Sequence, residues 1–167
     1  MDLILIGFMG SGKSTVGKLL AKKLNLNFYD LDVEIGKACD AEIKTIFKKF
    51  GERYFRELES KVLRKLIRED GILSTGGGTV MFNEQYLKNS GAQIILLEAD
   101  INSIDKRLNF DQERPLATNL NIKELYALKM QRQEQYLRCA DKIFYTNTLT
   151  PEEIVNEIIN NSAIYPK

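Results

Sequence analysis

The chain has 167 residues, of which 44% are hydrophobic and 28% charged, a composition typical of one globular domain. Its 24 Lys and Arg against 23 Asp and Glu give a formal net charge of +1, which argues against a nucleic-acid binder that depends on bulk positive charge. Because the sequence contains no His, it excludes a His general base, a Ser-His-Asp triad and every metal site that needs His. The composition therefore favours a small-molecule partner.

The two cysteines, Cys39 and Cys139, lie far apart in the sequence and outside any CxxC spacing. We interpret them as free thiols, as expected in the reducing cytoplasm. The apolar stretch from Met1 to Gly7 is too short for a membrane span and lacks the pattern of a signal peptide. We therefore expect a cytoplasmic protein with no membrane partner.

Short apolar runs alternate with stretches of helical periodicity along the chain. The first run, Leu3 to Ile6, ends at Gly7 and has the unbroken apolar pattern of a buried parallel strand. From Lys13 onward, apolar residues recur at helical spacing with lysines between them. Further strands are predicted at residues 28–29, 72–75, 93–97 and 142–145, and further helices over residues 43–50, 55–66 and 125–130.

Strands that alternate with helices predict βαβ units. The expected fold class is α/β, a three-layer α/β/α arrangement with a central five-stranded parallel sheet in one domain over residues 1–167. Thr150-Pro151-Glu152-Glu153 has an N-cap candidate and Pro at the first helical position, which predicts a last helix through Ile158. The polar stretch from Asn109 to Asn121, interrupted by Pro115, is predicted to be a mobile loop.

Residues 7–14, Gly-Phe-Met-Gly-Ser-Gly-Lys-Ser, match the pattern G-x-x-x-x-G-K-[ST] of a phosphate-binding loop. The loop lies between a predicted strand and a predicted helix, where its backbone amides would face phosphate oxygens. Lys13 would then meet the β- and γ-phosphates, and the Ser14 hydroxyl would be a magnesium ligand. An accidental match has a chance on the order of 1 in 10,000 or less per start position. No N-K-x-D motif occurs, so a GTPase is not favoured.

Charged residues that could form a second functional site follow later in the chain. Asp30 and Asp32 come after the second predicted strand, on the same rim as the phosphate loop, where two carboxylates could position a metal and accept a hydroxyl proton. The alternative is a surface turn or a helix cap. Arg56 and Glu59 are three residues apart and share a helix face, so Glu59 could hold the guanidinium, or the two could form an ordinary exposed ion pair.

The order of the motifs is more specific than any one of them. They are the phosphate loop, Asp30-Leu31-Asp32, Phe55-Arg56-Glu57-Leu58-Glu59, Ser74-Thr75-Gly76-Gly77-Gly78, Arg114-Pro115-Leu116, and Gln131-Arg132 followed by Tyr136. From residue 3 to about residue 145, this order and spacing resemble the shikimate kinase family. The resemblance implies a fold of the P-loop NTPase type and Mg²⁺-dependent transfer of the γ-phosphate of ATP to the 3-hydroxyl of shikimate. That reaction belongs to the pathway toward chorismate and aromatic amino acids.

The resemblance also implies roles for individual residues. Lys13, Asp32 and Arg114 would be catalytic, with Asp32 as the base. The ATP site would comprise Gly10, Ser11, Gly12, Lys13, Ser14, Thr15, Arg107 near the adenine, and Arg114 from the loop at 109–121, which resembles the lid of the family. The shikimate site would comprise Asp32, Arg56, Glu59, Gly76, Gly77, Gly78 and Arg132, with the two arginines on the carboxylate. The metal site would comprise Ser14 and Asp30, the latter through water.

Three alternatives stay open: a related carbohydrate-acid kinase such as gluconate kinase, a nucleoside monophosphate kinase, and a non-catalytic ATP-dependent switch. Arg56 with Glu59 and the triplet Gly76-Gly77-Gly78 favour shikimate over gluconate. The set of Asp32, Arg56, Arg114 and Arg132 argues against the switch. We expect a monomer whose partners are ATP and shikimate, with no nucleic acid.

Overall fold

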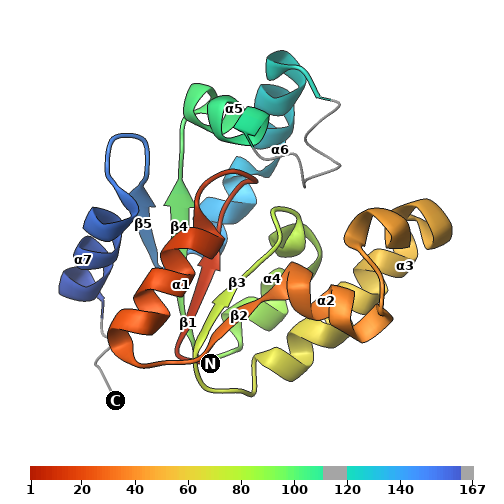
Figure 1. The fold of residues 1–167 in the computed structure, drawn as a ribbon, viewed down its shortest axis with the longest axis horizontal. Coiled ribbons are helices and arrows are strands. Elements are labelled where there is room, and N and C mark those ends of the chain that lie inside the picture. Colours follow the sequence, from red (N-terminus) through yellow and green to blue (C-terminus); the bar gives the residue numbers. More distant parts are fainter. Residues whose placement is uncertain (111–119, 163–167) are drawn as a thin grey trace.

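A parallel sheet forms the centre of the computed structural model, which describes residues 1–110 and 120–162 apart from the side chains of residues 109 and 110 (Figure 1). Its five strands are β1 (Leu3–Ile6), β2 (Phe28–Asp30), β3 (Ile72–Ser74), β4 (Gln93–Glu98) and β5 (Lys142–Tyr145). They lie in the order β2-β3-β1-β4-β5, and every neighbouring pair is parallel. The carboxyl ends of all five strands therefore meet at one edge of the sheet, as the sequence predicts.

Helices cover both faces of the sheet and complete the predicted three-layer α/β/α arrangement. They are α1 (Lys13–Leu24), α2 (Leu31–Cys39), α3 (Ile43–Leu66), α4 (Thr79–Lys88), α5 (Ile101–Phe110), α6 (Ile122–Cys139) and α7 (Pro151–Asn161). Side chains of α1 and α7 pack on the face that carries Leu3 and Leu5, and those of α3, α4 and α6 pack on the face that carries Ile4 and Ile6. Within the described ranges, no helix is long and apolar enough to cross a membrane.

Several helices differ from their predicted extents. The two predicted patterns over 43–50 and 55–66 belong to α3, which is interrupted at Gly51 with φ 80° and ψ 172°. The short helices α2, α4 and α5 were not predicted, because each offers few turns on which a periodic apolar pattern can develop. Residues 109 and 110, predicted as loop, belong to α5, and Asn121 is the N-cap of α6. Residues 111–119 of the predicted lid, with Arg114 and Pro115, lie outside the described residues.

The last helix begins as its sequence predicts. The Thr150 side chain accepts a hydrogen bond from the Glu153 amide, and the Glu153 carboxylate accepts one from the Thr150 amide at 2.7 Å. This reciprocal capping box satisfies two backbone N–H donors at the N-terminus of α7. The helix continues past Ile158 to Asn161, and its buried face of Ile154, Val155 and Ile158 packs against the sheet side that carries Leu3 and Leu5.

We expect Thr150→Ala to lower the free energy of unfolding by about 1 kcal/mol, because α7 loses its side-chain cap. Urea denaturation followed by circular dichroism measures this change. Thr148→Ala removes the same hydroxyl and methyl from an exposed position in the same loop and is the matched control. Equal losses in the two variants would contradict the capping role.

Candidate active site

The phosphate-binding loop connects β1 to α1 at the carboxyl edge of the sheet (Figure 1). Gly10 and Gly12 have φ values of 74° and 94°, a backbone region that side-chain-bearing residues rarely adopt, so glycine lets the loop curl here. The Lys13 ammonium lies across the loop, donates to the carbonyls of Gly7 and Phe8 at 2.9 Å each, and is only 5% exposed. A hollow of about 190 Å³ opens beside it, lined by Gly10, Gly12, Lys13, Ser14, Thr15, Arg107 and Leu108.

Three oxygen-bearing side chains meet next to this hollow. The Ser14 hydroxyl donates to Oδ2 of Asp30 at 2.6 Å, and its oxygen lies 3.5 Å from the Ser74 hydroxyl at the end of β3. The other oxygen of Asp30 accepts from the amides of Asp32 and Val33 and caps α2, so the cap interpretation of Asp30 also holds. Hydroxyl and carboxylate oxygens suit Mg²⁺, which takes few protein ligands beside phosphates. The sequence predicted no role for Ser74, although its position at the carboxyl end of β3 could have suggested one.

Arg107 joins α5 to the phosphate loop. Its Nη1 donates to the Gly10 carbonyl at 3.1 Å and to Oγ1 of Thr146 at 3.2 Å, and its Nη2 donates to the Thr146 carbonyl at 2.5 Å. The buried Thr146 hydroxyl contacts the Ser11 carbonyl at 3.2 Å. Arg107 therefore lies on the rim of the hollow and ties the loop after β5 to the phosphate loop. Sequence reasoning did not anticipate Thr146 as its partner.

The glycine triplet after β3 passes between Asp32 and the phosphate loop. A carbon atom added at Gly76 would lie 3.0 Å from Oδ1 of Asp32, and one added at Gly77 would lie 3.0 Å from the Met9 amide nitrogen. Both distances are shorter than ordinary contacts, so a side chain at either position would require Asp32 or the phosphate loop to shift by a few tenths of an ångström. The structure therefore places the predicted base within reach of the same turn that touches the phosphate loop.

Two carboxylates hold the guanidinium of Arg56. Its Nη1 donates to Oε2 of Glu59 at 3.0 Å, and its Nε and Nη2 donate to Oε1 of Glu52 at 3.3 and 3.2 Å. Glu59 is fully buried, and its other oxygen accepts from the Thr79 hydroxyl at 2.8 Å. A carbon atom added at Gly78 would lie 2.7 Å from Nη2 of Arg56. The structure thus brings Arg56 and Glu59 together as expected and adds Glu52, whose i, i+4 spacing was a usable signal.

The second predicted arginine reaches the same turn from α6. Nη1 of Arg132 donates to the Gly77 carbonyl at 3.1 Å, and the Tyr136 hydroxyl donates to that carbonyl as well. The Arg132 guanidinium carbon also lies 5.8 Å from the centre of the Phe8 ring. Burial raises the pKa of Tyr136 to about 12, although the Arg132 charge opposes the shift. The phenol therefore stays protonated and keeps its hydrogen bond.

Most predicted site residues converge at the carboxyl edge of the sheet. The phosphate loop, Asp30 and Arg107 form one group, and Asp32, Arg56, Arg132 and the glycine triplet form the other. The two groups touch where Gly77 approaches Met9. Arg114 lies outside the described residues, so its predicted contact with the phosphates stays a prediction.

Comparison with known proteins identifies the family. A family model described as shikimate kinase matches residues 9–163. The shikimate kinase of Limosilactobacillus fermentum is 43% identical over 162 residues, which cover 95% of this chain and 94% of that protein. The chain belongs to the shikimate kinase family. The shikimate kinase of Enterococcus faecalis is 41% identical over 161 residues, covering 95% of this chain and 96% of that protein.

Solved shikimate kinases share the fold. The enzyme from Acinetobacter baumannii, solved in complex with shikimate, superposes with a TM-score of 0.89 at 32% identity, covering 95% of this chain and 90% of that one. The enzyme from Aquifex aeolicus gives a TM-score of 0.82 at 37% identity, covering 96% and 95%. As a shikimate kinase, this chain is an ATP-dependent phosphotransferase.

If Arg56 binds the shikimate carboxylate as the sequence predicts, Gly78→Ala should raise the KM for shikimate about tenfold, because the new methyl group displaces the guanidinium and weakens its charge-assisted hydrogen bond to the substrate. Gly78 has φ −106° and ψ −8°, which alanine adopts without strain, so the effect comes from the methyl group alone. Steady-state kinetics measures it, and the KM for ATP should change less than about twofold. In the control Gly36→Ala the methyl group meets the Ala41 carbonyl at 3.3 Å, so an equal effect there would refute the steric explanation.

We expect Tyr136→Phe to lower the free energy of unfolding by about 1 kcal/mol at neutral pH, because the Gly77 carbonyl loses a donor. The pKa of Tyr136 is about 12 in the folded protein against 10.0 for an ordinary tyrosine, so the folded state holds the phenolic proton more tightly. The contribution of the protonated Tyr136 phenol to the free energy of unfolding is therefore complete below pH 10 and is lost between pH 10 and 12.

Urea denaturation at a series of pH values tests this pH dependence. The difference between wild type and Tyr136→Phe should narrow above pH 10. Tyr145→Phe changes an exposed tyrosine and should match wild type at every pH. A difference that stays constant across the alkaline range would be inconsistent with a protonated, buried phenol.

Proposed function

We propose that this enzyme transfers the γ-phosphate of ATP to the 3-hydroxyl of shikimate with Asp32 as the general base. The shikimate oxygen bonds to the γ-phosphorus, the bond from that phosphorus to the bridging oxygen breaks, ADP leaves, and the hydroxyl proton passes to Asp32. The observation that carries the proposal is the meeting of Asp32, Arg56 and Arg132 at one glycine turn that also touches the phosphate loop. Phosphoryl transfer depends mainly on such positioning and on charge neutralisation.

The phosphate loop supplies the ATP side of the site. Its backbone amides and the N-terminus of α1 would face the phosphate oxygens, and Lys13 would place its charge at the β- and γ-phosphates. The other residues proposed to contact ATP are Gly10, Ser11, Gly12, Ser14, Thr15, Arg107 and Arg114. The buried position of Lys13 supports this role, since the surrounding loop carbonyls already direct its ammonium into the curl.

Ser14 and Asp30 would hold the magnesium ion, with Asp30 acting through water. Their oxygens lie 2.6 Å apart beside the hollow, and this donor set fits a hard cation that also takes phosphate oxygens. When bound there, Mg²⁺ would neutralise charge that develops on the transferred phosphoryl group. Ser74 lies next to the pair and would keep the Ser14 hydroxyl in place.

Arg56 and Arg132 would bind the shikimate carboxylate, because a planar guanidinium matches a carboxylate with paired hydrogen bonds. Glu59 would orient Arg56, and the backbone of Gly76, Gly77 and Gly78 would approach the ring. The lid proposed for residues 109–121 would exclude water that otherwise competes with the hydroxyl. We further propose a single-domain monomer acting in the cytoplasm, where the thiols of Cys39 and Cys139 would stay reduced.

The acceptor is tested by ADP release from purified protein with Mg-ATP alone and with shikimate, gluconate or nucleoside monophosphates. We expect stimulation by shikimate only. Stimulation by another acceptor in its place would contradict the proposed substrate. Binding of ATP with no stimulation by any acceptor would favour the non-catalytic switch instead.

Two variants test the proposed roles of Asp32 and Arg132 separately. Asp32→Asn should lower kcat by about 10²- to 10⁴-fold with little change in the KM for ATP, because the hydroxyl proton loses its acceptor. Arg132→Ala should raise the KM for shikimate by roughly tenfold or more, as a charge-assisted hydrogen bond is worth about 1.5 to 3 kcal/mol. The control Arg138→Ala removes an exposed arginine of α6 that pairs with Glu84 and should leave kinetics unchanged. Normal kinetics in Asp32→Asn would rule out its role as base.

A further inference from the structure

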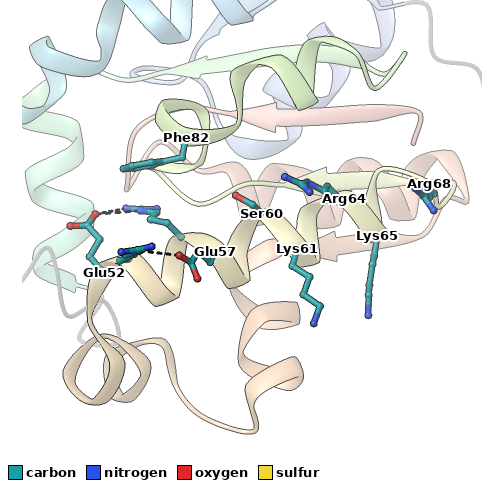
Figure 2. Close-up of a pocket in the computed structure, with 10 residues that line it drawn as sticks. Glu52, Glu57, Ser60, Lys61, Arg64, Lys65, Arg68 and Phe82 are labelled. Atoms are coloured by element: carbon teal, nitrogen blue, oxygen red, sulfur yellow. Dashed lines mark hydrogen bonds and ion pairs between the residues drawn. The ribbon is translucent and has the colours of Figure 1, made fainter.

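Phe82 presents a large apolar ring beside the proposed carboxylate site. It lies in the first turn of α4 and is 55% exposed. With residues of α3 it lines a hollow of about 910 Å³, and in Figure 2 it lies on the same side of this hollow as Glu52. The centre of its ring is 4.6 Å from the guanidinium carbon of Arg56. The guanidinium of the arginine proposed to bind substrate therefore lies over this ring.

A guanidinium offers two kinds of contact surface. Its edge donates hydrogen bonds, and its flat faces stack on aromatic rings. At Arg56, Glu59 and Glu52 accept three hydrogen bonds from the edge, and the guanidinium carbon lies over the Phe82 ring. A guanidinium has five N–H donors, so N–H groups remain for a ligand carboxylate. Contacts with both edge and face fix the plane in which those groups point.

The second ring near Arg56 belongs to the core. The centre of the Phe55 ring lies 5.1 Å from the same guanidinium carbon, but Phe55 is buried and also packs against Phe47 at 4.4 Å. Replacing Phe55 would therefore disturb the core together with the arginine. Phe82 can be replaced without leaving a buried cavity, so its effect on Arg56 can be measured separately.

A neighbouring pair of an arginine and an aromatic ring has a similar arrangement away from the proposed substrate site. Tyr86 lies one turn after Phe82 on α4 and is 44% exposed. Its ring centre is 4.1 Å from the guanidinium carbon of Arg64, which follows Arg56 on α3. Contacts between an arginine of α3 and an aromatic ring of α4 therefore also occur away from the proposed site, where they contribute to helix packing. What distinguishes Phe82 is that its arginine also contacts the buried Glu59 and abuts Gly78.

We propose that Phe82 is a positioning residue for shikimate binding, which it supports by stacking on the face of Arg56 and fixing the guanidinium plane. The proposal rests on the proposed role of Arg56 at the shikimate carboxylate. The ring also shields from water the ion pair of Arg56 with Glu59, whose side chains are 12% and 0% exposed, and so strengthens it. Phe82 acts in the binding step, so it affects binding of shikimate and not transfer of the phosphate.

Steady-state kinetics of Phe82→Ala tests this role. The KM for shikimate should rise about 3- to 10-fold, the range expected for loss of a cation–π contact, while kcat and the KM for ATP change less than about twofold. Phe82→Tyr and Phe82→Trp keep an aromatic face and should restore the wild-type KM. Phe82→Leu covers the arginine without such a face, so a wild-type KM in that variant would overturn the proposal.

Tyr86→Ala is the matched control, because it removes the equivalent ring from Arg64 and should leave the KM for shikimate unchanged. Thermal denaturation of both alanine variants separates folding from binding. In an Arg56→Ala background, Phe82→Ala should add nothing, since the two residues act through one contact.

Measuring Arg56→Ala beside Phe82→Ala separates the role of Phe82 from the carboxylate assignment. If Arg56→Ala raises the KM for shikimate and Phe82→Ala does not, the role of Phe82 is wrong and the carboxylate site stands. If Arg56→Ala itself leaves that KM unchanged, both the carboxylate assignment and the role of Phe82 are wrong.

Discussion

The buried carboxylate of Glu59 is the interaction on which the acceptor side of this kinase depends. A charge without access to water is unfavourable unless it is paired and fully hydrogen-bonded. Glu59 meets that condition with Arg56 on its own helix and with the Thr79 hydroxyl at the start of α4. Because the Glu59 carboxylate needs both of these hydrogen-bond partners, it joins α3 to α4 across the glycine turn. It also fixes the arginine that is proposed to receive the substrate carboxylate.

The backbone of Gly77 joins this acceptor side to the phosphate side. Its carbonyl accepts from Arg132 and Tyr136 of α6, and a side-chain carbon at this position would lie 3.0 Å from the Met9 amide of the phosphate loop. Helix α6 is anchored in turn by an ion pair between Lys129 and Glu98 at the end of β4. A shift of α6 would therefore alter the distance between the two halves of the site. Such coupling suits a reaction whose rate depends on alignment of donor and acceptor.

The sequence predicted the features that depend on local pattern. Strands β1, β3 and β4 were found because buried parallel strands are apolar runs, and Arg56 with Glu59 because three residues separate neighbours on a helix face. The contacts of Ser74, Thr146 and the Gly77 carbonyl could not be predicted, since each joins segments that only the folded sheet brings together. Phe82 gave no signal because its partner, Arg56, lies on another helix that only the fold brings next to it.

The balance of charge explains why so many contacts fix the direction of Arg56. Two arginines, Arg56 and Arg132, face the acceptor site, but Glu52 and Glu59 pair with the first of them. The two glutamates therefore offset the two arginines, and Asp32 nearby makes the net charge of these side chains negative. An anionic acceptor then cannot be held by charge alone and needs hydrogen bonds of correct geometry. Under the proposed assignment, selectivity for a carboxylate at a defined distance from a hydroxyl follows from orientation, and the residues that orient Arg56 contribute to it together with the arginine itself.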